Sequence, residues 1–286
     1  MPMTAPSRAQ SFTVNPLSPL MAAEVVGLDL RRPLDEATRD AVYQAFLKYQ
    51  VLVFRDQKLT KEEQIAATEQ FGTLEKHMPK NTGAEIALLH VVSNLGPDGK
   101  PAGKIGSQAW HSDKSFRPLP SLATFLHAVS MPPDGGDTCF ANLYAAYAAL
   151  PAMDKAALEG VRVVHSWEHS RTHRDGFKIT EAERLDAPPM SHPLVRTHPE
   201  TGRKCLFLGG HASHLDGVPF DEGRATVVRL EEFATSPQFV YRHKWRQGDM
   251  LMWDNRCLIH RADQNFDAAR FPRVLHRTCL RGTAPA

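Results

Sequence analysis

Two motifs that lie far apart in the chain place the strongest constraint on its fold. The first, residues 110–113, reads WHSD and carries His111 and Asp113; the second, residues 253–260, ends at His260. Two imidazoles and one carboxylate suit a divalent iron that is held on one face and left open on the other. A fold that uses these three side chains together must bring the second motif back against the first.

Short apolar runs separated by turns predict a chain built mostly of β-strands. Short apolar or alternating runs are typical of strands, and longer stretches with apolar residues at helical spacing are typical of helices. We predict strands at residues 51–54, 122–129, 192–198, 204–208, 239–245, 250–253 and 274–280, and helices at residues 35–49, 60–72, 143–150, 153–158 and 221–235. These elements predict a mostly β fold with flanking helices, a double-stranded β-helix of the jelly-roll kind.

The same patterns predict a single folded domain. Residues 1–12 are expected to form a flexible N-terminal tail, and residues 13–286 one domain. A long connection around residues 76–106 has weak periodicity and is expected to be a flap. The segment around residues 165–191 is rich in His, Arg and Asp, and we expect a lid there. Its histidines at positions 165, 169 and 173 recur at helical spacing, so they could line one helical face of a polar lid.

Composition excludes several classes of function. The 34 basic and 32 acidic side chains give a net charge of +2 without a long basic stripe, so we expect no nucleic-acid partner. No apolar run approaches the length of a membrane span, and the first residues lack a secretory signal, so we expect no membrane association. The four cysteines have no metal-binding spacing, which favours the reduced cytoplasm.

The candidate metal ligands are weak signals when each is taken alone. A His-x-Asp pair also suits a solvated turn, and His260, at the end of an apolar run, also suits a satisfied core histidine. On an extended segment, however, side chains two positions apart point to the same face, as a shared metal requires. Beyond His260 lie four arginines that could either hold an anionic small molecule or form a solvated basic edge: Arg261, Arg270, Arg273 and Arg277.

Five ordered blocks of sequence resemble one known family. They read HSD (residues 111–113), GGDT (135–138), HPLVRTHP (192–199), WDNR (253–256, followed by His260) and PRVLHR (272–277). Together they are similar to the taurine dioxygenase and 2,4-dichlorophenoxyacetate dioxygenase family of iron(II)- and 2-oxoglutarate-dependent oxygenases, which adopt a double-stranded β-helix. The likeness covers nearly the whole chain. It is closer to the phenoxyacetate branch through the blocks at residues 209–214, 240–243 and 256–257.

The resemblance implies a role for particular residues. It implies iron(II) ligands at His111, Asp113 and His260, a pair that holds the distal carboxylate of 2-oxoglutarate at Thr138 and Arg273, a contact for an acid group of the substrate at Arg277, and further pocket residues at Lys80, Asn81 and Ser107. The last three also suit a solvated flap. His211, His214 and His243 have no spacing that requires a metal and are left outside the iron site.

One departure from the family pattern leaves the 2-oxoglutarate arginine open. The 13 positions from His260 to Arg273 are slightly more than the resemblance leads us to expect, so Arg270 is a rival. We prefer Arg273 because its spacing to Arg277 matches the terminal block of the family. The extra residues then fall in the loop at residues 263–269.

The resemblance implies an enzyme, with two alternatives still open. The expected reaction is hydroxylation of a small anionic organic substrate by O2, with succinate and CO2 as co-products. Aryloxyalkanoates are favoured, and alkanesulfonates such as taurine or sulfate esters come next. We expect a cytoplasmic homo-oligomer. The alternatives are a zinc-dependent hydrolase with the same His/Asp/His ligands, and a non-catalytic jelly-roll binding module in which these residues are structural.

Overall fold

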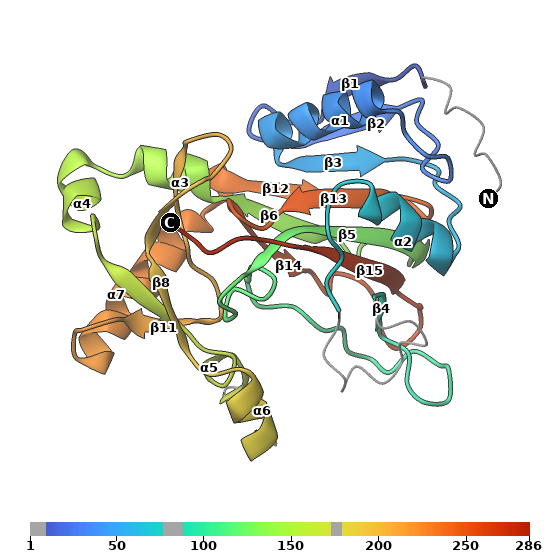
Figure 1. Cartoon of the computed structure of the whole chain (residues 1–286). Coiled ribbons are helices and arrows are strands. Elements are labelled where there is room, and N and C mark those ends of the chain that lie inside the picture. The colour runs from blue at the N-terminus through green and yellow to red at the C-terminus, as the bar shows by residue number, and fades with distance from the viewer. Residues whose placement is uncertain (1–9, 77–87, 173–178) are drawn as a thin grey trace.

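The structure is a computed structural model that describes residues 10–76, 88–172 and 179–286. Its centre is a seven-stranded sheet (Figure 1). In spatial order the strands are β1 (Thr13–Pro16), β2 (Ala23–Val26), β3 (Val51–Phe54), β13 (Met250–Asp254), β5 (Ser121–Ser130), β15 (Val274–Arg281) and β4 (His90–Ser93). Neighbours are antiparallel except β2 and β3, which are parallel.

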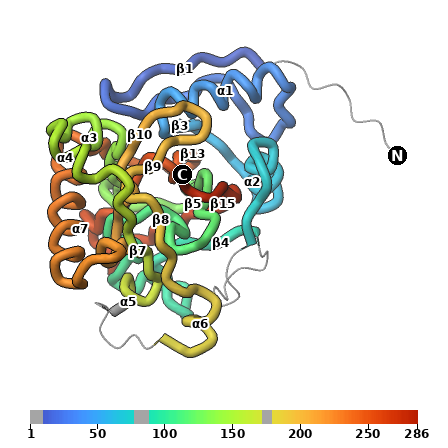
Figure 2. The backbone as a smooth tube through the Cα atoms, turned by 60° about the vertical axis from the view of Figure 1, so that its left-hand side comes forward, coloured from blue at the N-terminus to red at the C-terminus, as the bar shows by residue number. Residues whose placement is uncertain are grey.

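Three smaller sheets accompany the central one. The first contains β12 (Val240–His243), β6 (Thr138–Asn142) and β14 (Leu258–Ala262); the second contains β11 (Ala212–Leu215), β7 (Arg162–His165) and β8 (Met190–Pro193); the third contains β10 (Lys204–Leu206) and β9 (Val195–Thr197). Figure 2 shows β7, β8, β9 and β10 near the C-terminal end of the chain, where the N–H of Thr197 in β9 donates to the carbonyl of Ala286. The described part of the chain is therefore mostly β-structure with helices, as the sequence predicts.

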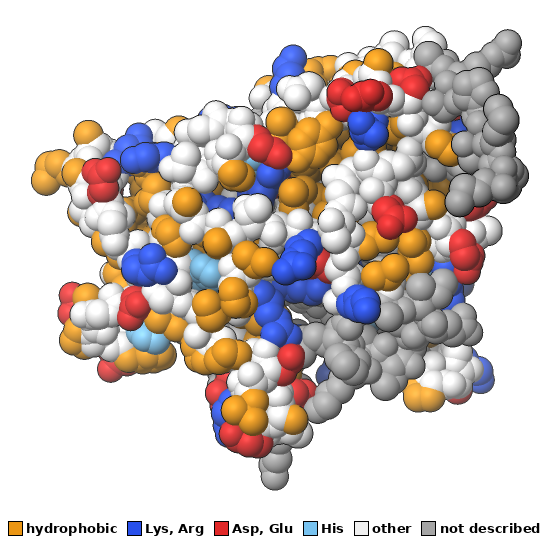
Figure 3. Space-filling model, in the orientation of Figure 1, with side chains coloured by type: hydrophobic (Ala, Val, Ile, Leu, Met, Phe, Trp, Pro, Cys, Tyr) orange, Lys and Arg blue, Asp and Glu red, His pale blue; other side chains and the backbone are white. Residues whose placement is uncertain are grey.

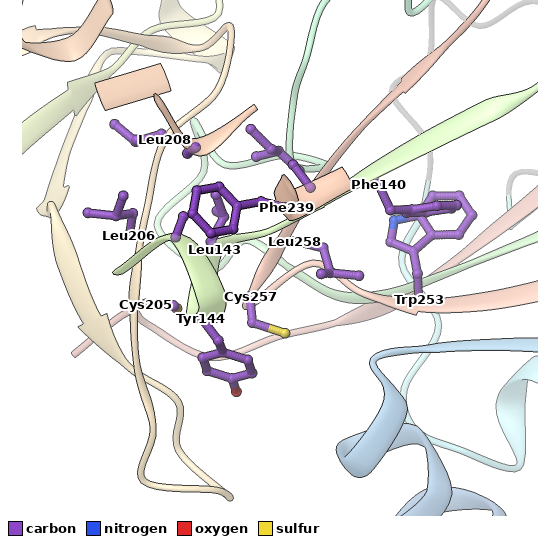
Figure 4. Packing of buried hydrophobic residues seen from close by; sticks show 14 of the residues in the cluster. Phe140, Leu143, Tyr144, Cys205, Leu206, Leu208, Phe239, Trp253, Cys257 and Leu258 are labelled. Atoms are coloured by element: carbon purple, nitrogen blue, oxygen red, sulfur yellow. The ribbon is translucent and has the colours of Figure 1, made fainter. Parts of the chain in front are cut away.

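The two faces of the central sheet belong to two different hydrophobic cores. Successive side chains of a strand point to opposite faces. In β13, Met250 and Met252 accordingly lie in one core, whereas Leu251 and Trp253 lie in the other. The second core extends to the small sheets, and Figure 4 shows Phe140 beside Trp253, with ring centroids 5.5 Å apart. This face also carries the candidate site.

Helices cover both cores. The described helices are α1 (Glu36–Tyr49), α2 (Lys61–Glu69), α3 (Leu143–Ala149), α4 (Ala152–Ala157), α5 (His169–Thr172), α6 (Glu181–Asp186) and α7 (Phe220–Ala234), with a 3₁₀ turn at Pro237–Phe239. A capping box opens α2, because the side chains of Thr60 and Glu63 accept from each other's backbone N–H groups. Each predicted long helix is found within a few residues of its expected bounds.

The segment predicted as a lid is partly ordered into regular elements. It contains the end of β7, the short helices α5 and α6, and the start of β8; residues 173–178 lie outside the described residues. The suggestion that His165 shares a helical face with His169 is wrong, because His165 is a buried residue of strand β7. Of the predicted flap, residues 77–87 lie outside the description, and β4 forms an edge of the central sheet.

No described helix has the length and apolar character needed to cross a membrane. On the face shown in Figure 3, a group of basic side chains lies near the centre. Acidic and apolar side chains surround this group.

Candidate active site

A short backbone bridge brings the two distant motifs together. The N–H of His111 donates to the carbonyl of His260 (3.0 Å), and the N–H of His260 donates to the carbonyl of His111 (2.8 Å). His260 lies on β14, and this pairing places both imidazoles side by side, with ring centroids 4.2 Å apart. The convergence required of the two motifs is therefore present.

Asp113 completes a group that can hold one cation. His111 Nε2 lies 4.0 Å from Asp113 Oδ1, and His260 Nε2 lies 3.9 Å from Asp113 Oδ2. One ligand atom from each residue lies within 4.8 Å of those of the other two. These separations exceed hydrogen-bonding distance, so the imidazoles face the carboxylate without bonding to it. The donor set of two imidazoles and one carboxylate fits iron(II).

The tautomer of His111 also fits a metal ligand. Its Nδ1 lies 2.8 Å from the carbonyl oxygen of Ala109, which can only accept, so Nδ1 carries the proton and the Nε2 lone pair faces the group. The ring of His260 packs against Trp253, with centroids 4.7 Å apart. Burial lowers the pKa of His111, and burial together with the nearby His111 lowers the pKa of His260 to about 3. Both imidazoles are therefore neutral at neutral pH, as ligands must be.

Asp113 is fixed in its ionised form by three neighbours. Thr124 Oγ1 donates to Asp113 Oδ2 (2.6 Å), and Arg277 Nη1 donates to Asp113 Oδ1 (3.2 Å). Asn255 accepts from the backbone N–H of Asp113 (3.3 Å) and donates to Thr124 Oγ1 (2.9 Å). Burial alone would raise the pKa of Asp113, but the charge of Arg277, helped by the hydrogen bond from Thr124, outweighs burial and holds that pKa well below its usual range.

Thr138 and Arg273, the predicted 2-oxoglutarate pair, lie together. Arg273 Nη2 is 3.5 Å from Thr138 Oγ1, and Arg273 Nε donates to the carbonyl of Gly136 (2.9 Å). The arginine is 3% exposed, burial lowers its pKa to about 10, and none of the ion pairs among the described residues includes it. A buried guanidinium without a carboxylate is costly unless an anion joins it. Its rival Arg270 is exposed and lies over the ring of Phe271.

The predicted substrate residues have different outcomes. Arg277 donates a hydrogen bond to Asp113, one of the three candidate metal ligands, and its side chain is 21% exposed. Ser107 contributes its carbonyl, which accepts from the N–H of Ala262 at the end of β14 (2.8 Å). Lys80 and Asn81 lie outside the described residues.

His211 lies beside the site, although its spacing in the sequence does not require a metal. Its ring meets that of His111 edge-on, with centroids 6.3 Å apart, and that of Phe116 at 4.9 Å. A signal was available in the glycines before it. Gly209 has φ +117°, and a Cβ there would lie 3.1 Å from the Cα of His111, so the backbone before His211 must pack directly on the first motif.

Comparison with known proteins identifies the family. A family model described as "Taurine catabolism dioxygenase TauD, TfdA family" matches residues 13–279. The chain belongs to this family. It is 42% identical over 272 residues to an alpha-ketoglutarate-dependent 2,4-dichlorophenoxyacetate dioxygenase from Cupriavidus pinatubonensis, covering 91% of this chain and 95% of that relative. It is 36% identical to an (S)-phenoxypropionate/alpha-ketoglutarate-dioxygenase from Sphingobium herbicidovorans, covering 88% and 89%.

A solved relative has the same overall fold. The crystal structure of AAD-2 in complex with Mn(II) and N-oxalylglycine matches with a TM-score of 0.86 at 40% identity, covering 96% of this chain and 98% of that one. N-oxalylglycine is an analogue of 2-oxoglutarate. This solved relative thus has the fold of this chain and holds a divalent metal together with a keto-diacid analogue.

Proposed function

We propose that this protein is an iron(II)- and 2-oxoglutarate-dependent dioxygenase. It hydroxylates a small anionic organic substrate and releases succinate and CO2. One observation supports the proposal: His111, Asp113 and His260 form a group that could hold a metal beside Arg277, and the buried Arg273 has no ion-pair partner among the described residues. Iron(II) needs three protein ligands and open positions for such chemistry, and this group supplies three.

The protein's part is to position and to shield. Iron(II), 2-oxoglutarate and O2 would supply the oxidising chemistry when bound. His111 and His260 present neutral nitrogen atoms, and Asp113 stays ionised through Thr124 and Arg277. Arg273 and Thr138 would hold the distal carboxylate of 2-oxoglutarate.

The substrate that we favour is an aryloxyalkanoate. The acid group would meet Arg277, and the rings of Phe116 and His211 offer an aromatic surface next to His111. The names of both relatives above point to aryloxy acids. Alkanesulfonates such as taurine, and then sulfate esters, rank next because they too carry an anion for Arg277. Ser107, Lys80 and Asn81 remain proposed pocket residues.

We also propose a context for the enzyme. The fold is a double-stranded β-helix of the jelly-roll kind, and residues 13–286 form one domain, because strands such as β13 contribute side chains to both hydrophobic cores. The proposed tail (residues 1–12), flap (around residues 76–106) and lid (around residues 165–191) each include residues that lie outside the described part of the chain. The protein acts as a cytoplasmic homo-oligomer.

Succinate formation tests the proposal. Purified protein would be supplied with iron(II), 2-oxoglutarate and O2, and with a panel of aryloxyalkanoates, alkanesulfonates and sulfate esters. We expect succinate in a one-to-one ratio with hydroxylated product for at least one aryloxyalkanoate. Activity that persists without O2 and 2-oxoglutarate would instead favour a zinc hydrolase. Ligand binding that is unchanged in His111→Ala, with no turnover in either protein, would favour a binding module.

A further inference from the structure

The position of the Arg273 guanidinium depends on a glycine turn. Its Nε donates to the carbonyl of Gly136, in the turn that joins β5 to β6. Gly135 and Gly136 both have positive φ, 78° and 70°, a conformation that glycine adopts readily but does not prefer over others. Two such residues in succession hold one shape only where other contacts fix them. If this turn changes its conformation, the carbonyl of Gly136 moves and the guanidinium of Arg273 moves with it.

Among the described residues, Arg242 and the backbone N–H of Asp263 also bond to Asp137, but the N–H of Gly136 bonds to Asn265. Asn265 Oδ1 accepts from the N–H of Gly136 (2.8 Å) and the N–H of Asp137 (3.3 Å), and its Nδ2 donates to Asp137 Oδ2 (3.0 Å). Both ends of this one amide thus bond to the glycine turn. Asn265 lies on the exposed loop between β14 and β15, the same loop that holds the extra residues before Arg273.

Asn94 fixes the other end of the same loop. Its Oδ1 accepts from the N–H of Arg273 (2.7 Å), and its Nδ2 donates to the carbonyls of Ala268 and Phe271, each at 2.9 Å. Asn94 is 2% exposed and follows β4 directly. The backbone of Arg273 is therefore held by Asn94, whereas its guanidinium is held through the turn that Asn265 fixes.

We propose that Asn265 is a positioning residue for the 2-oxoglutarate anchor. By fixing Gly136 and Asp137, it sets where the Arg273 guanidinium stands next to Thr138, and so sets the affinity for the distal carboxylate. This inference rests on the proposed function. It also assigns a function to the longer loop before Arg273, because this loop carries Asn265.

Anaerobic binding of two keto acids to the iron(II)-loaded protein tests the inference. 2-Oxoglutarate has a distal carboxylate, and pyruvate lacks it. For Asn265→Ala we expect the dissociation constant of 2-oxoglutarate to rise roughly tenfold, as for the loss of one hydrogen-bonded constraint on a charged contact. The dissociation constants of pyruvate and of iron(II) should stay within about twofold of those of the wild type.

The matched control is Gln264→Ala. This neighbouring residue bonds to Gly103, Ile105 and Gln108 but not to the glycine turn, so its loss should leave both keto-acid affinities unchanged. An Asn265→Ala protein whose 2-oxoglutarate affinity equals that of the wild type would overturn the inference. Equal losses for 2-oxoglutarate and pyruvate would also overturn it, because they would indicate general damage.

Arg273→Ala separates this inference from the proposed function. If Arg273→Ala loses affinity for 2-oxoglutarate and Asn265→Ala does not, the role of Asn265 alone is wrong. If Arg273→Ala binds 2-oxoglutarate as well as the wild type, or the wild type does not bind it, both the anchor and the role of Asn265 are wrong.

Discussion

Two buried aspartates with similar electrostatics have opposite surroundings. Asp113 and Asp254 are both buried, with exposed fractions of 5% and 1%. Each carboxyl group has a pKa well below its usual range, because a nearby arginine outweighs the effect of burial. Asp254 makes two parallel hydrogen bonds with Arg256, both 2.8 Å, and accepts from His198 Nε2 at 3.1 Å. Asp113 faces two imidazole nitrogens that stay at 3.9 and 4.0 Å.

The difference separates a structural cluster from a reactive one. In the Asp254 cluster His198 is satisfied on both sides, because its Nδ1 also accepts from the N–H groups of Glu200 and Thr201. In the Asp113 group the Nε2 atoms of His111 and His260 face the same carboxylate, and neither has a hydrogen-bond partner among the described residues. A buried polar group without a partner is costly, and such a cost is retained where a ligand supplies the missing partner. The comparison predicts that mutations in the two clusters will have different consequences.

The largest expected effect is on turnover. His111→Ala should lower kcat with 2-oxoglutarate by on the order of 10⁴-fold, because the metal loses one of three ligands. The free energy of unfolding without metal should fall less than when the Asp254 cluster is broken, because the substitution removes one hydrogen bond, from Nδ1 to the carbonyl of Ala109, and no bidentate ion pair. Succinate formation and denaturant unfolding of the same preparation measure the two quantities. If His111→Ala instead lost much of its free energy of unfolding and kept its turnover, His111 would be a structural residue and not a metal ligand.

Arg256→Ala should produce the opposite pattern. It breaks a bidentate pair and leaves Asp254 with one fewer counter-charge, at side chains only 4% and 1% exposed. Breaking such a pair typically costs about 3–5 kcal/mol. Chemical denaturation should show this loss in the free energy of unfolding, while protein that remains folded should bind iron(II) with wild-type affinity. Unchanged stability would show that the cluster is not structural.

Removal of the metal should destabilise the wild type alone. A ligand at about 100 times its dissociation constant stabilises the native state by about 2.7 kcal/mol. A chelator should therefore lower the Tm of iron-loaded wild type, and the Tm of His111→Ala should not respond to iron(II) or chelator. An equal response in both proteins would place the metal elsewhere.

The smallest effect concerns pH. The folded-state pKa of Asp254 is lowered, so its stabilisation is complete above the unfolded pKa of about 3.9 and is lost as pH falls through the folded value. The free energy of unfolding should then fall below about pH 4 with a contribution from this group of up to about 1.4 kcal/mol per pH unit. Asp254→Asn should lack that contribution. The check is a series of denaturation curves for both proteins between pH 5 and pH 2; parallel slopes would contradict the assignment.

Local sequence patterns predict much of the fold and of the metal group. The capping box at Thr60 and the continuous apolar run of β13 depend on near neighbours, so they can be seen in the sequence. The set of His111, Asp113 and His260 could be inferred because its chemistry is distinctive, although its convergence depends on long-range pairing.

Other parts of the site depend on contacts that have no local signature. Asn265 and Asn94 act through hydrogen bonds to turns far away in the chain, and asparagine in a loop is common. The position of His211 depends on the packing of Gly209 on His111. The i, i+4 spacing of His165 and His169 predicts a shared helical face, but such spacing also occurs outside helices, and His165 belongs to strand β7. Long-range packing decides these residues.

The most direct test of the central claim is optical titration under anaerobic conditions. Addition of iron(II) and then 2-oxoglutarate to the wild type should produce a visible charge-transfer band that saturates at one equivalent of metal. His111→Ala should not produce the band, whereas Gln264→Ala should produce it as the wild type does. A wild-type protein that shows no band at saturating iron(II) and 2-oxoglutarate, or a band of full intensity in His111→Ala, would contradict the claim that these three side chains hold one iron that 2-oxoglutarate chelates.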